Sequence, residues 1–328
     1  MAAPDHELVV GVDGGGTSTR VVVGAPDGRV LGEGSAGSGN LHDVGAERLA
    51  ENIGAAWRDA STAGGVAPDP DRTTVLCAMA SVGTAPERAR VADLVAGLGI
   101  APPERVTVDV DLIAALAAAL GGEPGVAVIA GTGSSCLGRD PSGARWQAGG
   151  WGSLLDDVGG ATWVGTQAMV AAVRAHDGRG EATALTGMVQ EQFGLAHLRE
   201  LLVRVDANHL PRGERAALAP LVTAAAEEGD RAALGILRRG AEALAECVGA
   251  AVRRLDFGAG EVLVGVTGGL ADGVPAYREL CHDEVHRTVP SARCVEPRTD
   301  NARGAFLEAL RVHQGGTLRA DVRARALL

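Results

Sequence analysis

One pattern constrains the fold of this chain more than any other: an apolar strand, a bare glycine turn and a second apolar strand. It occurs first as VVGVDGGGTSTRVVV at residues 9–23 and again as VAVIAGTGSSCLGRD at residues 126–140. Each copy ends in a hairpin-type turn, and a third apolar strand with a glycine turn, EVLVGVTGGL, follows at residues 261–270. Two similar openings predict a chain built from two duplicated halves that face one another.

Helices are expected between these strands. The spacing of apolar residues predicts helices over residues 86–98, 112–120 and 231–255, and another over NARGAFLEALRV, residues 301–312. In the segment 231–255 the apolar residues recur every three or four positions, which is typical of a long helix with one buried face. Strands that alternate with helices indicate α/β domains, and a length of 328 residues suggests two of them.

The composition excludes several classes of protein. The chain has no lysine, so all 30 basic residues are arginine. Walker-type P-loops, protein kinases and Schiff-base enzymes each need a lysine and are therefore excluded. A net charge of −11 argues against a nucleic-acid partner. The N-terminus lacks the pattern of a signal peptide, no apolar run could span a membrane, and five dispersed cysteines indicate reduced thiols, so a cytoplasmic protein is expected.

The first candidate site is the turn Gly14, Gly15, Gly16 and Thr17 with Asp13 before it. A turn without bulky side chains lets backbone N–H groups approach a phosphate closely. A tight hairpin needs glycine for conformational reasons alone, which is the competing explanation. Asp13 is the natural carboxylate to hold a divalent cation through water.

The second glycine turn, Gly131, Thr132, Gly133 and Ser134, has the same chemistry of backbone donors and hydroxyls. Two such loops at equivalent positions could hold a polyphosphate from both sides. Because the chain has no lysine, a divalent cation would have to neutralise that phosphate. The pair of loops makes a purely conformational role for the glycines less convincing than it is for either loop alone.

Asp111 ends the strand VTVDVD and precedes the apolar segment LIAALAAAL. Taken alone, the better interpretation is a helix N-cap, since aspartate accepts a hydrogen bond from the first helical turn. The carboxyl end of a strand is also where α/β proteins place active sites, so Asp111 could act as a general base on a hydroxyl. Asp109, two residues earlier, is the rival candidate.

The segment WQAGGWGSLLDDVGGATWVG, residues 146–165, carries three of the four tryptophans and the pair Asp156 and Asp157. Tryptophans in such numbers usually belong to a core or an interface. A carboxylate among glycines beside an indole also suits a polyhydroxylated ligand, whose hydroxyls need acceptors. Asn40, in GSGNLHDVG, could contribute to such a site or be an ordinary turn residue.

Through these motifs the chain resembles the N-acetylglucosamine kinase group of the BadF/BadG/BcrA/BcrD ATPase family, which belongs to the actin-like, hexokinase-like ATPase superfamily. The resemblance runs from about residue 8 to 312. GVDGGGTSTR is similar to the first phosphate motif, AVIAGTGSSC to the second, and VTGGL to the adenosine-side motif. GGWGSLLDDVGGATW resembles the family's Gly-Trp-Gly…Gly-Asp-Glu-Gly-Ser segment, and residues 218–244 resemble one of its helical stretches.

The resemblance implies a fold and a division into domains. The fold is α/β, with two duplicated actin-like (ribonuclease H-like) ATPase domains and a cleft between them that closes over ATP and sugar. Residues 1–118 would form the N-terminal lobe, with a helix at about 301–313 packing back on it, and residues 119–300 the larger C-terminal lobe. Residues 314–328 are expected to form a loosely attached tail. A homodimer is expected by analogy.

The resemblance also implies a role for each matching position. Asp111 aligns with the catalytic aspartate that takes the proton from the sugar 6-hydroxyl. Residues 14–17 and 131–134 would hold the phosphates of ATP, and Asp13 would lie near Mg²⁺. Gly268 and Gly269 would line the adenosine pocket. The sugar would be bound by Asn40, Thr132, Ser135, Trp151, Gly152 and Asp157.

Two departures from the family pattern lie near the expected sugar site. Where the family commonly reads Gly-Asp-Glu-Gly-Ser, this chain reads Asp156-Asp157-Val158-Gly159-Gly160, and Ser135 stands where the animal-type enzyme has asparagine. The reaction class is unaffected, but the two departures leave the 2-substituent of the sugar open. N-acetylglucosamine, glucosamine and N-acetylmuramate are therefore all candidate substrates. An ATPase that activates a CoA-linked dehydratase or reductase, and a non-catalytic sugar sensor, are the alternative functions.

Overall fold

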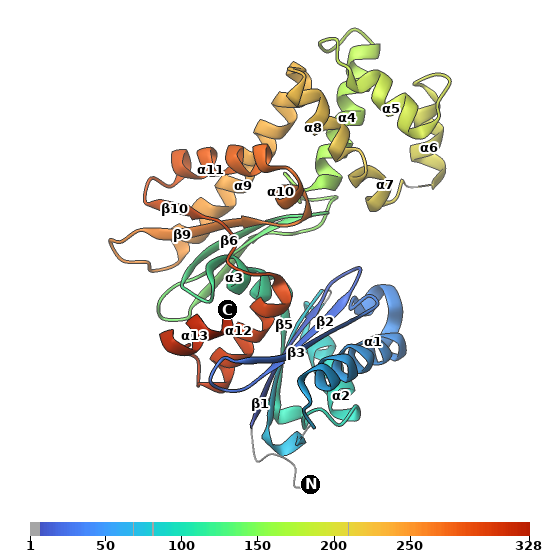
Figure 1. The fold of residues 1–328 in the computed structure, drawn as a ribbon. Coiled ribbons are helices and arrows are strands. Elements are labelled where there is room, and N and C mark those ends of the chain that lie inside the picture. The colour runs from blue at the N-terminus through green and yellow to red at the C-terminus, as the bar shows by residue number, and fades with distance from the viewer. Residues whose placement is uncertain (1–6, 68, 81, 209) are drawn as a thin grey trace. The chain divides into compact units, whose positions relative to one another are not determined.

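A computed structural model describes residues 7–67, 69–80, 82–208 and 210–328. The chain divides into two compact units, each built around a five-stranded mixed sheet (Figure 1). Unit 1 takes the residues up to Glu123 together with those from Glu296 onward, and unit 2 takes Pro124–Val295.

Unit 1 begins with three antiparallel strands and continues with two parallel strands that alternate with helices. Its elements are β1 (Leu8–Gly14), β2 (Thr19–Gly24), β3 (Val30–Ala36), α1 (Leu41–Gly64), β4 (Thr73–Met79), α2 (Ala85–Gly97), β5 (Val106–Val110) and α3 (Leu112–Leu120), with short 3₁₀ turns before β4 and β5. From the far end of the chain come α12 (Asn301–His313) and α13 (Ala320–Ala326).

Unit 2 has the same order of strands with more helices inserted. Its elements are β6 (Gly125–Ala130), β7 (Ser134–Arg139), β8 (Arg145–Gly149), α4 (Ala161–His176), α5 (Leu185–Phe193), α6 (Glu200–Asn208), α7 (Arg212–Ala216), α8 (Ala219–Glu227), α9 (Arg231–Arg254), β9 (Val262–Thr267), α10 (Gly269–Gly273), α11 (Pro275–Thr288) and β10 (Ala292–Val295).

The two sheets share one topology. In unit 1 the strand order is β3-β2-β1-β4-β5, and in unit 2 it is β10-β9-β6-β7-β8, which is the same order read from the other edge. In both, the first strand pairs antiparallel with the second and parallel with the fourth. The prediction of two duplicated α/β halves is therefore confirmed, and the resemblance of the two glycine turns reflects equivalent positions in the two sheets.

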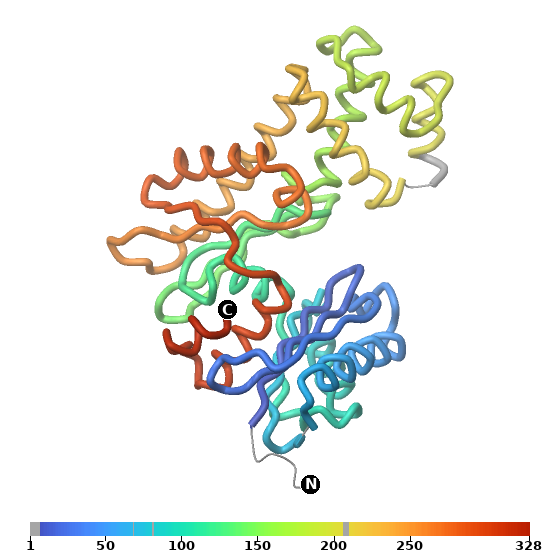
Figure 2. Tube along the Cα trace, in the orientation of Figure 1, coloured from blue at the N-terminus to red at the C-terminus, as the bar shows by residue number. Residues whose placement is uncertain are grey.

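The last helices of the chain return to unit 1. Helix α12 packs on α3 and on the central strand β1, with Phe306 and Leu310 fully buried, and Figure 2 shows this red segment beside the blue N-terminal strands. Residues 314–328, expected to form a loosely attached tail, instead contain a packed helix. Residues 320–326 form α13, with Val322 and Ala326 buried, and Arg325 pairs with Asp27 at 2.6 Å.

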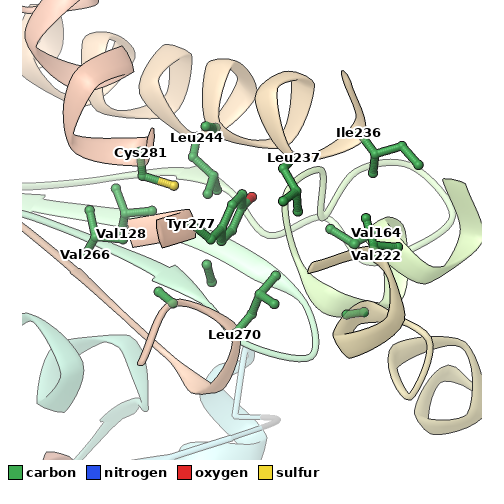
Figure 3. Packing of buried hydrophobic residues seen from close by; sticks show 14 of the residues in the cluster. Val128, Val164, Val222, Ile236, Leu237, Leu244, Val266, Leu270, Tyr277 and Cys281 are labelled. Carbon is green, nitrogen blue, oxygen red and sulfur yellow. The ribbon is translucent and has the colours of Figure 1, made fainter. Parts of the chain in front are cut away.

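Apolar side chains from the helices cover the sheet of each unit. In unit 2, residues of α4, α8, α9 and α11 meet Val126 and Val128 of β6 in one continuous cluster. Figure 3 shows Tyr277 of α11 within this cluster, beside Leu237 and Leu244 of α9. The helices predicted at 86–98, 112–120, 231–255 and 301–312 are found within two residues of those limits. In the described part of the chain, no helix is long and apolar enough to cross a membrane.

Candidate functional site

Asp13 lies at the carboxyl end of the central strand β1 and is buried. Its cross-strand neighbour on β2 is Arg20, and the Arg20 guanidinium donates to an Asp13 carboxylate oxygen at 3.1 Å. Burial raises the pKa of Asp13, while the hydrogen bond and charge of Arg20 act in the opposite direction. Asp13 is therefore a buried acid whose position is fixed by a neighbouring strand.

The first glycine turn is braced from two directions. The carbonyl of Gly14 accepts from the N–H of Ala80, which follows β4, at 2.8 Å. The carbonyl of Gly15 accepts from the N–H of Gly39, just before α1, at 2.9 Å. At the tip, Gly16 and Thr17 are exposed. A rigid turn with an exposed, side-chain-poor tip is the arrangement that a phosphate-binding loop requires.

Asp111 follows β5, two strands from β1 in the same sheet. Burial, and after it the negative charge of Asp13, raises the pKa of Asp111 above its usual value. The expected capping hydrogen bond is absent from α3, because Asp111 itself has helical dihedral angles (φ −55°, ψ −27°) rather than the extended geometry of a capping residue. Asp111 therefore occupies the predicted N-cap position without the predicted capping hydrogen bond, although the backbone N–H groups of Leu112 and of Asp111 itself act to lower the pKa of its carboxylate.

The rival residue Asp109 is held differently. One of its carboxylate oxygens accepts from the N–H of Val110 at 2.8 Å and lies 3.7 Å from the guanidinium of Arg88 on α2. Asp109 is thus engaged by its own strand and by an arginine, which supports a structural role.

Asn40 is the N-cap of α1, and its side-chain carbonyl accepts from the N–H of His42 at 2.9 Å. The residue before it, Gly39, donates to the first glycine turn. The structure thus brings Asn40 to that turn within unit 1. With its carbonyl used in the cap, the Asn40 amide NH₂ is the group that would donate to a ligand.

The second glycine turn is tied to the first turn of α4. The N–H groups of Ala161 and Thr162 donate to the carbonyls of Gly131 and Thr132 at 2.8 and 3.0 Å. The hydroxyl of Ser134 donates to the carbonyl of Val158 at 2.9 Å. The second glycine turn is therefore bound on one side of Gly133 by the first turn of α4 and on the other side by the loop that precedes α4.

Asp157 lies in that loop, and its side chain is 5% exposed. One carboxylate oxygen accepts from the N–H of Gly152 at 3.2 Å, and the other accepts from the guanidinium of Arg212 at 2.9 Å. Asp157 is also the one described non-glycine residue with positive φ, at 58°. A strained backbone and a buried carboxylate with two partners indicate a side chain held in one position by its surroundings.

Gly133 shows how closely the second turn approaches Asp157. A Cβ atom on Gly133 would lie 2.5 Å from an Asp157 carboxylate oxygen and 2.9 Å from a guanidinium nitrogen of Arg212. A side chain at this position is therefore incompatible with the Asp157–Arg212 pair, which gives the glycine a reason beyond loop flexibility.

Ser135 and Trp151 are placed less directly. Side chains alternate along a strand, so the Ser135 hydroxyl turns away from Val158 and accepts from the side-chain amide of Gln147 on β8 at 3.3 Å. Trp151 is 77% exposed, and Leu154 and Leu155 of the same loop are exposed as well. Of the predicted sugar-site residues in unit 2, Gly152 and Asp157 contact each other, Ser135 is hydrogen-bonded to Gln147, and Trp151 is exposed.

The motif VTGGL, residues 266–270, which resembles the adenosine-side motif, adjoins the second glycine turn. Gly268 has a φ of 108°, and a Cβ on it would lie 2.7 Å from the carbonyl carbon of Ala130. Asp272 of α10 accepts from the Gly268 N–H at 3.1 Å and from the guanidinium of Arg278 at 2.6 Å. Gly268 is thus fixed against the start of the second glycine turn within unit 2.

Sequence reasoning missed the residues that support these loops. Arg212 and Arg215 of α7 reach Asp157 and Ser153, and the hydroxyl of Tyr277, the one tyrosine, donates to the carbonyl of Gly159 at 2.9 Å. Spacing of three along one helix was the available signal for the two arginines. Nothing local points to Tyr277, because its partner lies 118 residues away.

A model of the BadF/BadG/BcrA/BcrD ATPase family matches residues 10–309. An N-acetylmuramic acid/N-acetylglucosamine kinase of Clostridium acetobutylicum is 26% identical over 308 residues, which cover 92% of this chain and 98% of that protein. An N-acetyl-D-glucosamine kinase of Dictyostelium discoideum is 27% identical over 313 residues, covering 93% and 98%.

Among solved structures, a protein of Chromobacterium violaceum described as a candidate N-acetylglucosamine kinase matches with a TM-score of 0.73 and 28% identity, covering 94% of this chain and 100% of that one. A ROK hexokinase of Thermus thermophilus matches with a TM-score of 0.59 at 16% identity, over 94% and 100% of the two chains, and thereby shows the shared actin-like ATPase fold.

Proposed function

Because the chain belongs to the BadF/BadG/BcrA/BcrD ATPase family, we propose that it is an ATP-dependent kinase that phosphorylates the 6-hydroxyl of an amino sugar. N-acetylglucosamine is the proposed substrate, and glucosamine and N-acetylmuramate are the alternatives. Matching relatives named as kinases of N-acetylmuramic acid, N-acetylglucosamine and glucosamine support the class of substrate.

The observation that carries this proposal is the state of Asp111. Its pKa is raised by burial and by the charge of Asp13, and its carboxylate is not used to cap α3. A carboxylate with a raised pKa is a stronger base, and the most effective general base has a pKa close to the working pH. Asp111 would orient the sugar hydroxyl and accept its proton while the hydroxyl oxygen bonds to the γ-phosphorus and ADP leaves with the electrons of the broken P–O bond.

Other residues would bind and orient the substrates. The turns 14–17 and 131–134 would donate backbone N–H groups to phosphate oxygens, and Gly268 with Gly269 would border the adenosine. In unit 1 the amide of Asn40 would donate a hydrogen bond to a sugar oxygen, and in unit 2 the carboxylate of Asp157 would accept one from a sugar hydroxyl. Positioning of this kind supplies most of the catalysis in phosphoryl transfer.

The family implies a divalent cation, and the acids of unit 1 fit one. Asp13 and Asp111 are acidic groups whose like charges oppose each other, which raises the pKa of Asp111. A cation near Asp13 would relieve that repulsion, and oxygen ligands are those that Mg²⁺ prefers. When bound, Mg²⁺ would neutralise charge on the phosphates of ATP.

The test is ADP release, measured by a coupled assay with Mg²⁺-ATP and a panel of five sugars: N-acetylglucosamine, glucosamine, N-acetylmuramate, N-acetylmannosamine and glucose. Sugar-dependent release with N-acetylglucosamine ranked first by kcat/KM is the expected result. A different first rank would replace the substrate but keep the kinase. ADP release that ignores every sugar would support the activator ATPase instead, and sugar binding without ADP release would support a sensor.

One observation weighs against the activator ATPase. Such proteins hold an iron–sulfur cluster through cysteine thiolates, and the cysteine nearest the second turn is Cys136 in β7. Cys136 is fully buried in the core of unit 2, and this burial raises the pKa of its thiol well above the usual value. A buried neutral thiol is a poor cluster ligand.

A further inference from the structure

Arg212 makes a contact that no motif accounts for. It begins α7, and its guanidinium donates to the buried carboxylate of Asp157 at 2.9 Å, although 52% of the Arg212 side chain is exposed. A buried carboxylate is expensive to leave without a partner, so this contact fixes Asp157 where a sugar hydroxyl would have to find it.

The same guanidinium borders the second glycine turn. A nitrogen of Arg212 would lie 2.9 Å from a Cβ placed on Gly133, and the missing side chain leaves room for it. The Arg212 guanidinium therefore pairs with the predicted sugar-binding acid and lies beside the predicted phosphate-binding loop. In a chain without lysine, an arginine beside this loop is a direct source of positive charge for a phosphate.

The position of α7 is itself fixed. Arg215, one helical turn after Arg212, donates to the hydroxyls of Ser153 and Thr166 at 3.4 Å. Gly165 of α4 allows the backbone of α7 to pack against α4, because any Cβ there would collide with the carbonyl of Arg215. Arg212 thus projects from a held helix, and movement of its side chain alone can alter its contacts.

We infer that Arg212 is a positioning residue that couples nucleotide binding to sugar binding, by donating at once to Asp157 and to a phosphate oxygen of the nucleotide at Gly133. This inference rests on the proposed function. A guanidinium has five N–H donors in a planar fork, so one side chain can serve two anions. When a phosphate holds the exposed side of Arg212, its side chain loses freedom, and Asp157 is fixed before the sugar arrives. The sugar then binds more tightly to the nucleotide-bound protein.

The experiment measures the dissociation constant of N-acetylglucosamine by calorimetry, with and without the Mg²⁺ complex of a non-hydrolysable ATP analogue. For the wild-type protein we expect the analogue to tighten sugar binding by about 5- to 150-fold, the usual range of such coupling. Arg212→Gln should bind the sugar equally with and without the analogue. Arg212→Lys, which keeps the charge but loses the fork, should retain part of the coupling.

Arg204→Gln is the matched control. Arg204 of α6 also pairs with a carboxylate, Glu214 of α7, at 2.8 Å, so this change loosens the same helix without touching Asp157. Its coupling factor should stay within about twofold of the wild-type value, whereas the coupling in Arg212→Gln should be lost. Full coupling in Arg212→Gln, equal loss in Arg204→Gln, or no coupling in the wild type would each overturn the role of Arg212. Failure of the wild type to bind any sugar of the panel would instead overturn the proposed function and this inference with it.

Discussion

The carboxylates of Asp13 and Asp111 are electrostatically coupled: after burial, the charge of Asp13 is the largest influence that raises the pKa of Asp111. The two residues come from β1 and from the end of β5, which β4 separates in the sheet of unit 1. Strand order brings together two acids that are almost a hundred positions apart in the sequence. One acid thereby tunes the other, which is a common device for setting the strength of a base.

Asp13→Asn should shift the pH dependence of the reaction. Asp111 must be ionised to accept a proton, so kcat/KM falls as the pH drops through its pKa. Loss of the Asp13 charge lowers that pKa, and the acidic limb of the profile should move to lower pH, together with a lower maximal rate. The measurement is the pH profile of residual activity. A limb that stays in place would mean that Asp13 does not act on the base.

Asp111→Asn should lower kcat by about 10²- to 10⁴-fold, the usual contribution of a general base, while the sugar and the ATP analogue still bind. Calorimetry of both ligands beside the rate assay tests this. Residual turnover above a few per cent would assign the base to another residue.

Asp111→Asn should also make the protein more stable at neutral pH. Folding raises the pKa of Asp111 above its usual value of 3.8. Between pH 3.8 and the pKa of the folded state, the folded protein therefore binds more protons than the unfolded protein. The free energy of unfolding therefore falls as pH rises through this window, and the penalty is complete above it. Asparagine at position 111 removes this loss of stability, which is about 1.4 kcal/mol for each unit by which folding raises the pKa of Asp111. Melting curves should differ at pH 7 and converge near pH 3.

Local sequence predicted the parts of the site that depend on a few consecutive residues. The strand–turn–strand units and the helix after Asp111 were predictable, because glycine turns and apolar periodicity are local signals. The N-cap position of Asp111 was predicted, but its capping hydrogen bond was not found, because the dihedral angles of one residue depend on how the strand enters the helix. The contact between Arg212 and Asp157 could not be predicted from local sequence, since the two residues are 55 positions apart and only the fold brings them together.

Gly268→Ala should weaken nucleotide binding selectively. A side chain at φ 108° is strained by about 1–3 kcal/mol, and its Cβ would meet the backbone of Ala130. We expect the dissociation constant of the ATP analogue to rise by about tenfold or more, with sugar affinity in the absence of nucleotide preserved. Gly273→Ala is the control, because a Cβ there, in the last position of α10, meets no atom within 4 Å. Equal affinities in the two variants would contradict a role for the 267–270 turn in nucleotide binding.

Tyr277→Phe should separate a positioning role from simple core packing. The Tyr277 ring is fully buried beside Leu244, and its hydroxyl donates to the carbonyl of Gly159, two residues after Asp157 (Figure 3). Phenylalanine keeps the ring and leaves that carbonyl without its donor, at a cost of about 1–3 kcal/mol. Because the freed loop carries Asp157, the KM for the sugar should rise more than the KM for ATP.

Thr223→Val provides the comparison for Tyr277→Phe. It also removes a buried hydroxyl that donates to a carbonyl, that of Pro220 at 2.8 Å, but within α8 and away from the loop of Asp157. Urea unfolding should show a loss of stability in both variants, since each loses one buried hydrogen bond. Only Tyr277→Phe should raise the KM for the sugar. If both variants lose stability and neither changes that KM, Tyr277 serves the core alone, and Ser134 remains as the side chain that ties the Asp157 loop to the second glycine turn.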